Sequence, residues 1–428
     1  MASLPADSAV SSVQRRTMIV LIIAQVVGTV GVGVAPSIGV LLAEEVTHNE
    51  AWAGLARTAS TLGAALFGLW LGTVAARRGR RVALSRGWAL AAAGAALLVV
   101  AAQLSLIIPL FVGLLFIGAG SAVSLQSRFA ATDLAEPQHK ARSLALVVWV
   151  GTLGSVLGPN LGAPGEFVGS ITGLTVFANA FLIAAVFLAL AGIVVFAWLR
   201  PDPLLVLEQT TGTQATAAGK KPIRFRQMFA EIQANPQARI ALIAILTSQT
   251  VMAAIMTMTP VHISHQGGSI TLIGITISLH VAGMYALSPL VGLVTDRFGY
   301  RFAISTGIAI FMASLIIGAV KPHDMTGIIV SLILLGIGWS FGSVAGAALF
   351  SAVVAPETRA ASQGGVDALS NLSGAIAGFI AGPLLVLTSF SFLSILAMVA
   401  LVPLAVLMTT NARTLYSEPV PEQAIGSD

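Results

Sequence analysis

The sequence contains no cysteine and very few charged residues. Cysteine is absent from all 428 residues, which excludes disulfide bonds, thiolate nucleophiles and cysteine-ligated metal centres. Asp, Glu, Lys and Arg make up only 9% of the chain, whereas a soluble globular domain carries about a quarter. Because so little charge cannot cover a folded surface with polar side chains, we expect lipid to surround most of the protein.

Hydrophobic residues make up 56% of the sequence and are grouped in long runs. A helix needs about 20 apolar residues to cross a bilayer, and a spanning segment has to pair its own backbone polar groups. The runs therefore predict an all-α integral membrane protein with twelve transmembrane helices. The expected spans are 17–43, 51–76, 82–103, 107–131, 143–163, 171–199, 239–262, 271–294, 302–320, 325–353, 362–388 and 391–410.

A long polar stretch separates the first six spans from the last six. The expected parts are a cytoplasmic N-terminal tail (1–16), a six-helix bundle (17–199), a cytoplasmic linker (200–238), a second six-helix bundle (239–411) and a cytoplasmic C-terminal tail (412–428). The first apolar run is too long for the core of a cleaved signal peptide, so it is predicted to be retained as a span.

The distribution of positive charge predicts the orientation. With the N-terminus inside, all of the 22 Lys and Arg residues except Arg57 and Lys321 fall on one side. Because cytoplasmic loops are enriched in Lys and Arg, both termini are predicted to be cytoplasmic, in an inner or plasma membrane. The net charge of +5 does not indicate nucleic acid, because the positive residues form short clusters between apolar runs.

Two motifs recur at the same distance along the chain. Residues 72–81 (GTVAARRGRR) align with residues 292–301 (GLVTDRFGYR), 220 positions later. The glycine triplet 154, 158 and 162 recurs at 374, 378 and 382, again 220 positions later. Two unrelated motifs with one offset predict two parallel six-helix repeats.

The paired loops resemble the signature of the major facilitator superfamily, G-x-L-A-D-R-x-G-R-R. Ala76 stands where the family has an acidic residue, whereas the second loop keeps it as Asp296. The resemblance covers essentially the whole chain and implies two six-helix halves that rock around a central substrate site. It assigns the conformational motif to Gly72, Arg77, Gly79, Arg80, Arg81, Gly292, Asp296, Arg297, Gly299 and Arg301.

The fifth span looks like the G-x-x-x-G-P-x-x-G-G pattern of the drug and metabolite antiporter branch, with its last glycine missing. Gly154, Gly158 and Gly162 would clear one helix face for close packing, and Pro159 would bend the helix. A tight helix contact without further function is the alternative. In the fourth span, Leu114 stands where proton-coupled exporters of the family carry arginine, so the resemblance leaves proton coupling open.

Four ionisable residues are candidates for coupling or for a conformational lock, because such residues in spans usually face a cavity or a partner. His280 could relay protons or form a buried hydrogen bond to a neighbouring helix. Arg57 could bind a substrate anion or pair externally with a nearby glutamate. Asp367, in the eleventh span, could replace the acid missing at position 76 by pairing with a loop arginine while Asp133 pairs with another; otherwise it carries protons or caps its helix.

Seven further residues lie at the depth expected for a central cavity, where methionine and aromatic side chains suit large apolar or aromatic substrates. They are Gln25, Trp149, Gln249, Met252, Met256, Tyr285 and Trp339.

The expected function is secondary active export of small amphipathic or apolar compounds, with protons as a possible coupling ion. No P-loop supports ATP hydrolysis, and we expect a monomer in membrane lipid that needs no cofactor or metal. An importer or uniporter of a small metabolite is the alternative. A polytopic membrane enzyme or a sensor is more remote, because the short outer loops hold no catalytic cluster.

Overall fold

The structure, a computed structural model, describes residues 6–136, 139–211, 232–233, 235–354 and 359–410. Its regular elements within these ranges are all helices, with no β-strand. The expected C-terminal tail and most of the expected linker lie outside the described residues. The all-α prediction is confirmed.

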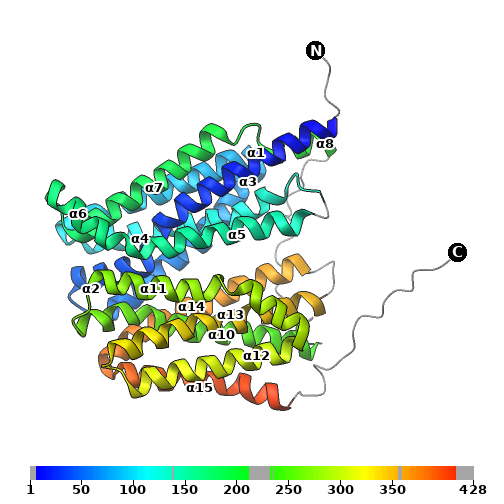
Figure 1. Cartoon of the computed structure of the whole chain (residues 1–428). Coiled ribbons are helices and arrows are strands. Elements are labelled where there is room, and N and C mark those ends of the chain that lie inside the picture. The colour runs from blue at the N-terminus through cyan, green and yellow to red at the C-terminus, as the bar shows by residue number, and fades with distance from the viewer. Residues whose placement is uncertain (1–5, 137–138, 212–231, 234, 355–358, 411–428) are drawn as a thin grey trace.

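The chain forms two bundles that lie side by side (Figure 1). The first contains α1 (Ala6–Val32), the π-helical turn η1 (Ala35–Gly39), α2 (Val40–Thr47), α3 (Ala51–Leu104), α4 (Ile107–Thr132), α5 (Lys140–Leu157), the 3-10 turn η3 (Gly158–Leu161), α6 (Gly162–Thr172) and α7 (Val176–Trp198), and α8 (Pro203–Thr211) follows it. The second contains α10 (Pro236–His265), α11 (Ile270–Tyr285), α12 (Ser288–Val320), α13 (Met325–Val353), α14 (Arg359–Leu387) and α15 (Phe390–Thr410).

Two glycines interrupt the longest helical segments. Ten segments of the described residues are apolar and long enough to span a membrane, but Ala51–Leu104 has 54 residues and Ile270–Val320 has 51. Gly79 in the first (φ 85°, ψ 169°) and Gly299 in the second (φ 84°, ψ 162°) leave the helical conformation for one that favours glycine. Counting each interrupted segment as two passes agrees with the twelve expected spans. The shared conformation 220 residues apart supports the predicted repeat.

The helix connections lie at two ends of the molecule. We call the end that carries Gly79, Gly299 and the start of α8 the linker side, and the opposite end the hairpin side. The hairpin side holds the turns at 48–50, 105–106, 173–175, 266–269, 321–324 and 388–389. In Figure 1 the linker side lies at the right, where α8 is labelled.

On the hairpin side the two halves meet backbone to backbone. A Cβ built at Gly54 of α3 would clash with the carbonyl oxygen of Gly378 in α14 and lie 3.1 Å from that of Phe379. A Cβ built at Gly274 of α11 would lie 2.7 Å from the carbonyl oxygen of Pro159 in η3. The glycines of the two crossings are 220 residues apart, and so are Pro159 and Phe379. The halves are therefore joined by two equivalent crossings of small residues.

Hydroxyl groups add hydrogen bonds beside these crossings. Thr58 Oγ1 donates to the carbonyl oxygen of Ala375 at 3.0 Å, and Ser278 Oγ donates to that of Val156 at 2.5 Å. The side-chain amide of Asn160 also donates to Ser278 Oγ, at 2.7 Å. Thr58 and Ser278 again occupy equivalent positions of the repeat. These bonds hold the halves together on the hairpin side.

A histidine and two glutamates form a charged bridge at the same end. His265, at the end of α10, places Nε2 2.5 Å from Glu44 Oε1 and Nδ1 3.3 Å from Glu50 Oε1. Both carboxylates belong to the first half, whereas His265 belongs to the second. A protonated imidazole donates from both nitrogens, so this bridge also joins the halves.

The fifth-span glycines lie against α1 within the first half. A Cβ at Gly158 would lie 2.6 Å from Gly33 Cα and 2.6 Å from the carbonyl oxygen of Val30. One at Gly154 would clash with Thr29. Gly162 instead faces the second half, where its Cβ would clash with Ile270. The motif therefore contacts α1 through two glycines and α11 through the third.

Replacing Gly158 with a larger residue should destabilise the first half. We expect Gly158→Ala to lower the melting temperature of the purified protein and Gly158→Leu to lower it further, because overpacking costs about 1–3 kcal/mol. Gly68→Ala is the matched control, since its Cβ would meet only the Ala122 Cβ, at 3.9 Å. An unchanged melting temperature in Gly158→Leu would contradict the close packing of η3 on α1.

Removing the charged bridge should loosen the hairpin side. We expect His265→Gln to lengthen and broaden the distances between spin labels placed on the hairpin-side ends of the two halves. His323→Gln, which changes an exposed histidine in another turn of the same side, should leave these distances as they are. Identical distance distributions in wild type and His265→Gln would show that the bridge does not hold the halves.

Candidate functional site

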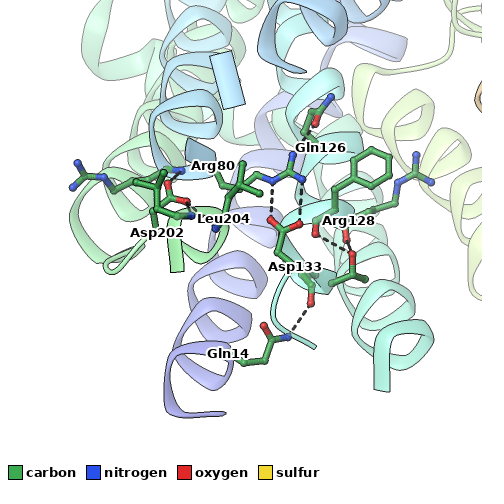
Figure 2. A network of polar contacts seen from close by, with 12 residues as sticks. Gln14, Arg80, Gln126, Arg128, Asp133, Asp202 and Leu204 are labelled. Carbon is green, nitrogen blue, oxygen red and sulfur yellow. Dashed lines mark hydrogen bonds and ion pairs between the residues drawn. The ribbon is translucent and has the colours of Figure 1, made fainter. Parts of the chain in front are cut away.

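The loop at Gly79 is built around a carboxylate from the start of the linker. Asp202 Oδ2 accepts a hydrogen bond from the backbone N–H of Arg81 at 2.7 Å, and its Oδ1 accepts one from that of Leu204 at 3.0 Å (Figure 2). A Cβ at Gly79 would clash with this carboxylate. Glycine is therefore needed here both for its positive φ and for the space it leaves.

Arg80 of the same loop forms a two-point ion pair with Asp133 at the end of α4 (Figure 2). Its Nε donates to Oδ2 at 2.8 Å and its Nη2 donates to Oδ1 at 3.2 Å, while Nη1 donates to Gln126 Oε1 at 3.4 Å. The side chains are only 14% and 10% exposed. Such paired charge-assisted bonds are strong and directional. This pair fastens α3 to α4 within one half.

The remaining arginines of the first loop point elsewhere. Arg81 places its guanidinium over the Phe196 ring of α7, at 5.3 Å from the ring centre. Arg77 is exposed, and Gly72 has only the Gln126 amide nearby, at 3.6 Å from a built Cβ. The motif residues thus gather at the linker side of the first half, with Arg80 and Arg81 engaged.

The equivalent loop of the second half is more open. Asp296 and Arg297 are exposed, and Arg297 lies over its neighbour Phe298 at 5.6 Å. A Cβ at Gly292 or Gly299 would meet nothing within 4 Å, and Arg301 is partly buried. The two loops share a backbone conformation but differ in their surroundings.

Three of the expected cavity residues lie together in the second half. The ring of Tyr285 (α11) meets that of Trp339 (α13) edge to face, with 5.5 Å between centres. Trp339 Nε1 donates to Gln249 Oε1 of α10 at 3.0 Å, and Gly374 of α14 leaves room for this amide, since its Cβ would lie 2.9 Å from Gln249 Nε2. All three side chains are partly buried.

Charged residues from both halves reach the same region. Arg57 of α3 and Arg128 of α4 both act electrostatically on Tyr285. Arg128 is also the charge that acts on Asp367, an exposed residue of α14. α3 and α4 of the first half therefore bring positive charge near the Tyr285–Trp339 pair of the second half.

Arg57 has no counter-ion among the described residues. Its guanidinium makes no hydrogen bond or ion pair there, and its Cγ would lie 3.5 Å from a Cβ at Gly378. Of the two nearby acids, Glu44 pairs with His265 and Glu45 is exposed. The external ion pair considered from the sequence is therefore not formed in the structure.

His280 lies inside the second half and is fully buried. Its Nδ1 is 2.8 Å from the carbonyl oxygen of Leu332 in α13, while Nε2 has no hydrogen-bond partner among the described atoms. A neutral ring with the proton on Nδ1 fits these surroundings. His280 therefore forms the buried hydrogen bond to a neighbouring helix that was one of its two expected roles. A role of His280 in proton transfer stays a proposal.

The other cavity candidates lie in two places: Met252 and Met256 belong to the buried cluster against which Tyr285 and Trp339 pack, whereas Gln25 and Trp149 belong to the first half. Met252 and Met256 are 2% and 4% exposed in the core of the second half. Gln25 is buried in the first half beside Gly151, where a Cβ would lie 2.9 Å from its Nε2. Trp149 of α5 is 49% exposed.

Three features of this arrangement were not predicted from the sequence: the roles of Asp202 and Arg128, and the contact of His265 with Glu44. Asp202 precedes Pro203, and an acidic residue before proline is a signal for a helix N-cap that could have found it. Arg128 lies in the last turns of an apolar span. It could therefore have been predicted as a candidate for the same reason as Arg57, because both are ionisable residues in spans. No sequence signal joins His265 to Glu44, because helix ends from different halves can meet in many ways.

The cluster of His265, Glu44 and Glu50 is also the group of described residues whose donor atoms could hold a metal ion, all within 4.8 Å of one another. Each ring nitrogen already faces a carboxylate oxygen. The ion-pair arrangement therefore satisfies the cluster without a metal.

Comparisons with known proteins agree with this architecture. The family model of the Major Facilitator Superfamily matches residues 17–279 and 240–426. The MFS-type transporter YddS of Bacillus subtilis is 37% identical, and the alignment covers 89% of this chain and 87% of YddS. The riboflavin transporter RfnT of Brucella anthropi is 30% identical, and the alignment covers 87% of this chain and 89% of RfnT. The crystal structure of the nucleoside transporter NupG has a TM-score of 0.66 at 15% identity, covering 95% of this chain and 100% of that one. The chain belongs to the Major Facilitator Superfamily.

Proposed function

We propose that this protein is a secondary active transporter that exports small amphipathic or apolar compounds by alternating access. The linker side faces the cytoplasm, because the described Lys and Arg residues other than Arg57 and Lys321 fall there. The hairpin-side contacts then close the outer end, and substrate reaches the central residues from the cytoplasm. Rocking of the halves would break these contacts and close the linker side.

The observation that carries this proposal is the convergence of both halves on the Tyr285–Trp339 pair. Tyr285, Trp339 and Gln249 come from the second half, and Trp339 donates to Gln249. α3 of the first half meets α14 beside them, because Thr58 donates to the carbonyl oxygen of Ala375 and the neighbouring Gly374 packs against the Gln249 amide. A binding site between two moving bodies becomes accessible from either side without being rebuilt. This is the arrangement that alternating access requires.

The relatives suggest which compounds to test first. RfnT is named a riboflavin transporter, and riboflavin is a flat, amphipathic molecule that suits an aromatic pair beside an amide. Import or uniport of such a metabolite is the second candidate, because the fourth span carries Leu114 in place of the arginine of proton-coupled exporters. Loading everted vesicles with and without a pH gradient distinguishes export driven by protons from the other modes.

Transport should depend on the aromatic pair. We expect purified protein in liposomes to move radiolabelled riboflavin or another flat amphipathic compound saturably, and Trp339→Ala to reduce transport at least about tenfold, because stacking and the bond to Gln249 are both lost. Trp198→Ala, at the exposed end of α7, is the control. Equal transport by wild type and Trp339→Ala would exclude this site.

Asp367 should favour closure of the linker side. Because Arg80 is already paired with Asp133, we propose that Asp367 pairs with another arginine of the first half, with Arg128 the first candidate. Asp367→Asn should shift the population toward the open linker side, as measured by distances between spin labels on the two linker-side ends.

Two further variants complete this test. The double variant Asp367→Arg with Arg128→Asp should partly restore the wild-type distances, since it recreates the pair with reversed charges. Asp324→Asn, an exposed acid of the hairpin side, should have no effect. Wild-type distances in Asp367→Asn would remove Asp367 from the closing contact.

A further inference from the structure

The charges around the Tyr285–Trp339 pair do not balance. Two guanidinium groups, Arg57 and Arg128, act on Tyr285, and one carboxylate, Asp367, lies in the field of Arg128. His280 is fully buried against Leu332 and fits a neutral ring. Among the described residues, the first half thus brings two guanidinium groups near this pair and the second half brings one carboxylate, which leaves one guanidinium without a carboxylate.

Arg57 is the residue whose charge is unmatched. Its guanidinium has five N–H donors and stays charged at any physiological pH. It is partly buried next to α14, yet it finds no acceptor among the described residues. A charged group in an apolar span normally pairs with another group or with water in a cavity. An acceptor from outside the chain would complete this arrangement.

The immediate surroundings of Arg57 indicate where such an acceptor would bind. Gly54 and Thr58, one turn before and one residue after Arg57, both contact α14, so Arg57 lies within the closed end. Tyr285 lies within electrostatic reach of Arg57 and contacts Trp339 edge to face. An anionic substituent on a flat ring that binds this aromatic pair would therefore lie in the field of the Arg57 guanidinium.

We propose that the transported compound is a small organic anion with a flat unsaturated body, whose anionic group binds Arg57 while the body contacts Tyr285 and Trp339. This inference deepens the proposed function and rests on it. The guanidinium fork suits a carboxylate or a phosphate, which can accept two parallel bonds. Arg128, balanced in part by Asp367, contributes to the positive field.

The proposal is tested with pairs of compounds that share a ring and differ in an anionic group. The pairs are benzoate with benzamide, riboflavin phosphate with riboflavin, and adenosine monophosphate with adenosine. Their binding to the purified full-length protein is measured by thermal shift and by quenching of tryptophan fluorescence. We expect at least one anion to bind about tenfold more tightly than its neutral partner.

Variants of Arg57 then test whether this residue causes the preference for the anion over its neutral partner. Arg57→Gln should remove the difference between anion and neutral partner, whereas Arg57→Lys should keep part of it, because the charge remains but the fork is lost. Arg86→Gln, an exposed arginine near the linker side of α3, is the control and should bind like wild type. Melting temperatures of the unliganded variants show whether each is folded. If Arg57→Gln is not folded, the comparison with wild type is made with Arg57→Lys.

The outcomes separate this inference from the proposed function. If no anion binds more tightly than its neutral partner in any of the three pairs, or if none of the three anions binds, the anion assignment is overturned. An anion preference that survives in folded Arg57→Gln also overturns it. Saturable transport of a neutral compound that depends on Trp339 would keep the transporter and its site while removing the role of Arg57.

Discussion

The close approach of backbones at the hairpin side is the contact on which the arrangement of the two halves depends. At Gly54 and at Gly274, any side chain would collide with carbonyl groups of the opposite half. In a membrane no hydrophobic effect drives helices together, so packing of small residues and interhelical hydrogen bonds have to do so. Thr58 and Ser278 supply those bonds from equivalent positions. These two crossings fix how the halves meet on the hairpin side.

The two halves share a backbone plan but not the same contacts. Gly79 and Gly299 have nearly identical φ and ψ values, and the first loop in addition holds a partly buried ion pair and a linker carboxylate. Asp202 approaches so closely that no Cβ fits at Gly79, whereas Gly299 has free space. The first loop is thus fastened to its own half. Asp296 in the second loop is exposed, which leaves its carboxylate available to other partners.

The fold could be predicted from the sequence to a large extent, because it follows from local properties. Apolar runs fix the helices, and the offset of 220 residues between the glycine motifs anticipated the repeat seen in Gly79 and Gly299. The partners of individual side chains could not be predicted as well. Helices that are apolar on all sides carry little information about their rotation, so the sequence did not show that Met252 faces the core or that Trp339 bonds Gln249. Contacts such as His265 with Glu44 depend on how two separate bundles dock.

Arg57 belongs both to the closed hairpin side and to the proposed binding site. The residues on either side of it along the helix face, Gly54 and Thr58, make the contacts with α14 that close this end. In the proposed cycle, opening the hairpin side separates α3 from α14 and brings Arg57 into water, where a guanidinium needs no counter-ion. With the hairpin side closed, the same charge is held between the halves. An anion bound there would neutralise the guanidinium while both ends are closed during rocking, so the loaded transporter would pass through this state more readily than the empty one.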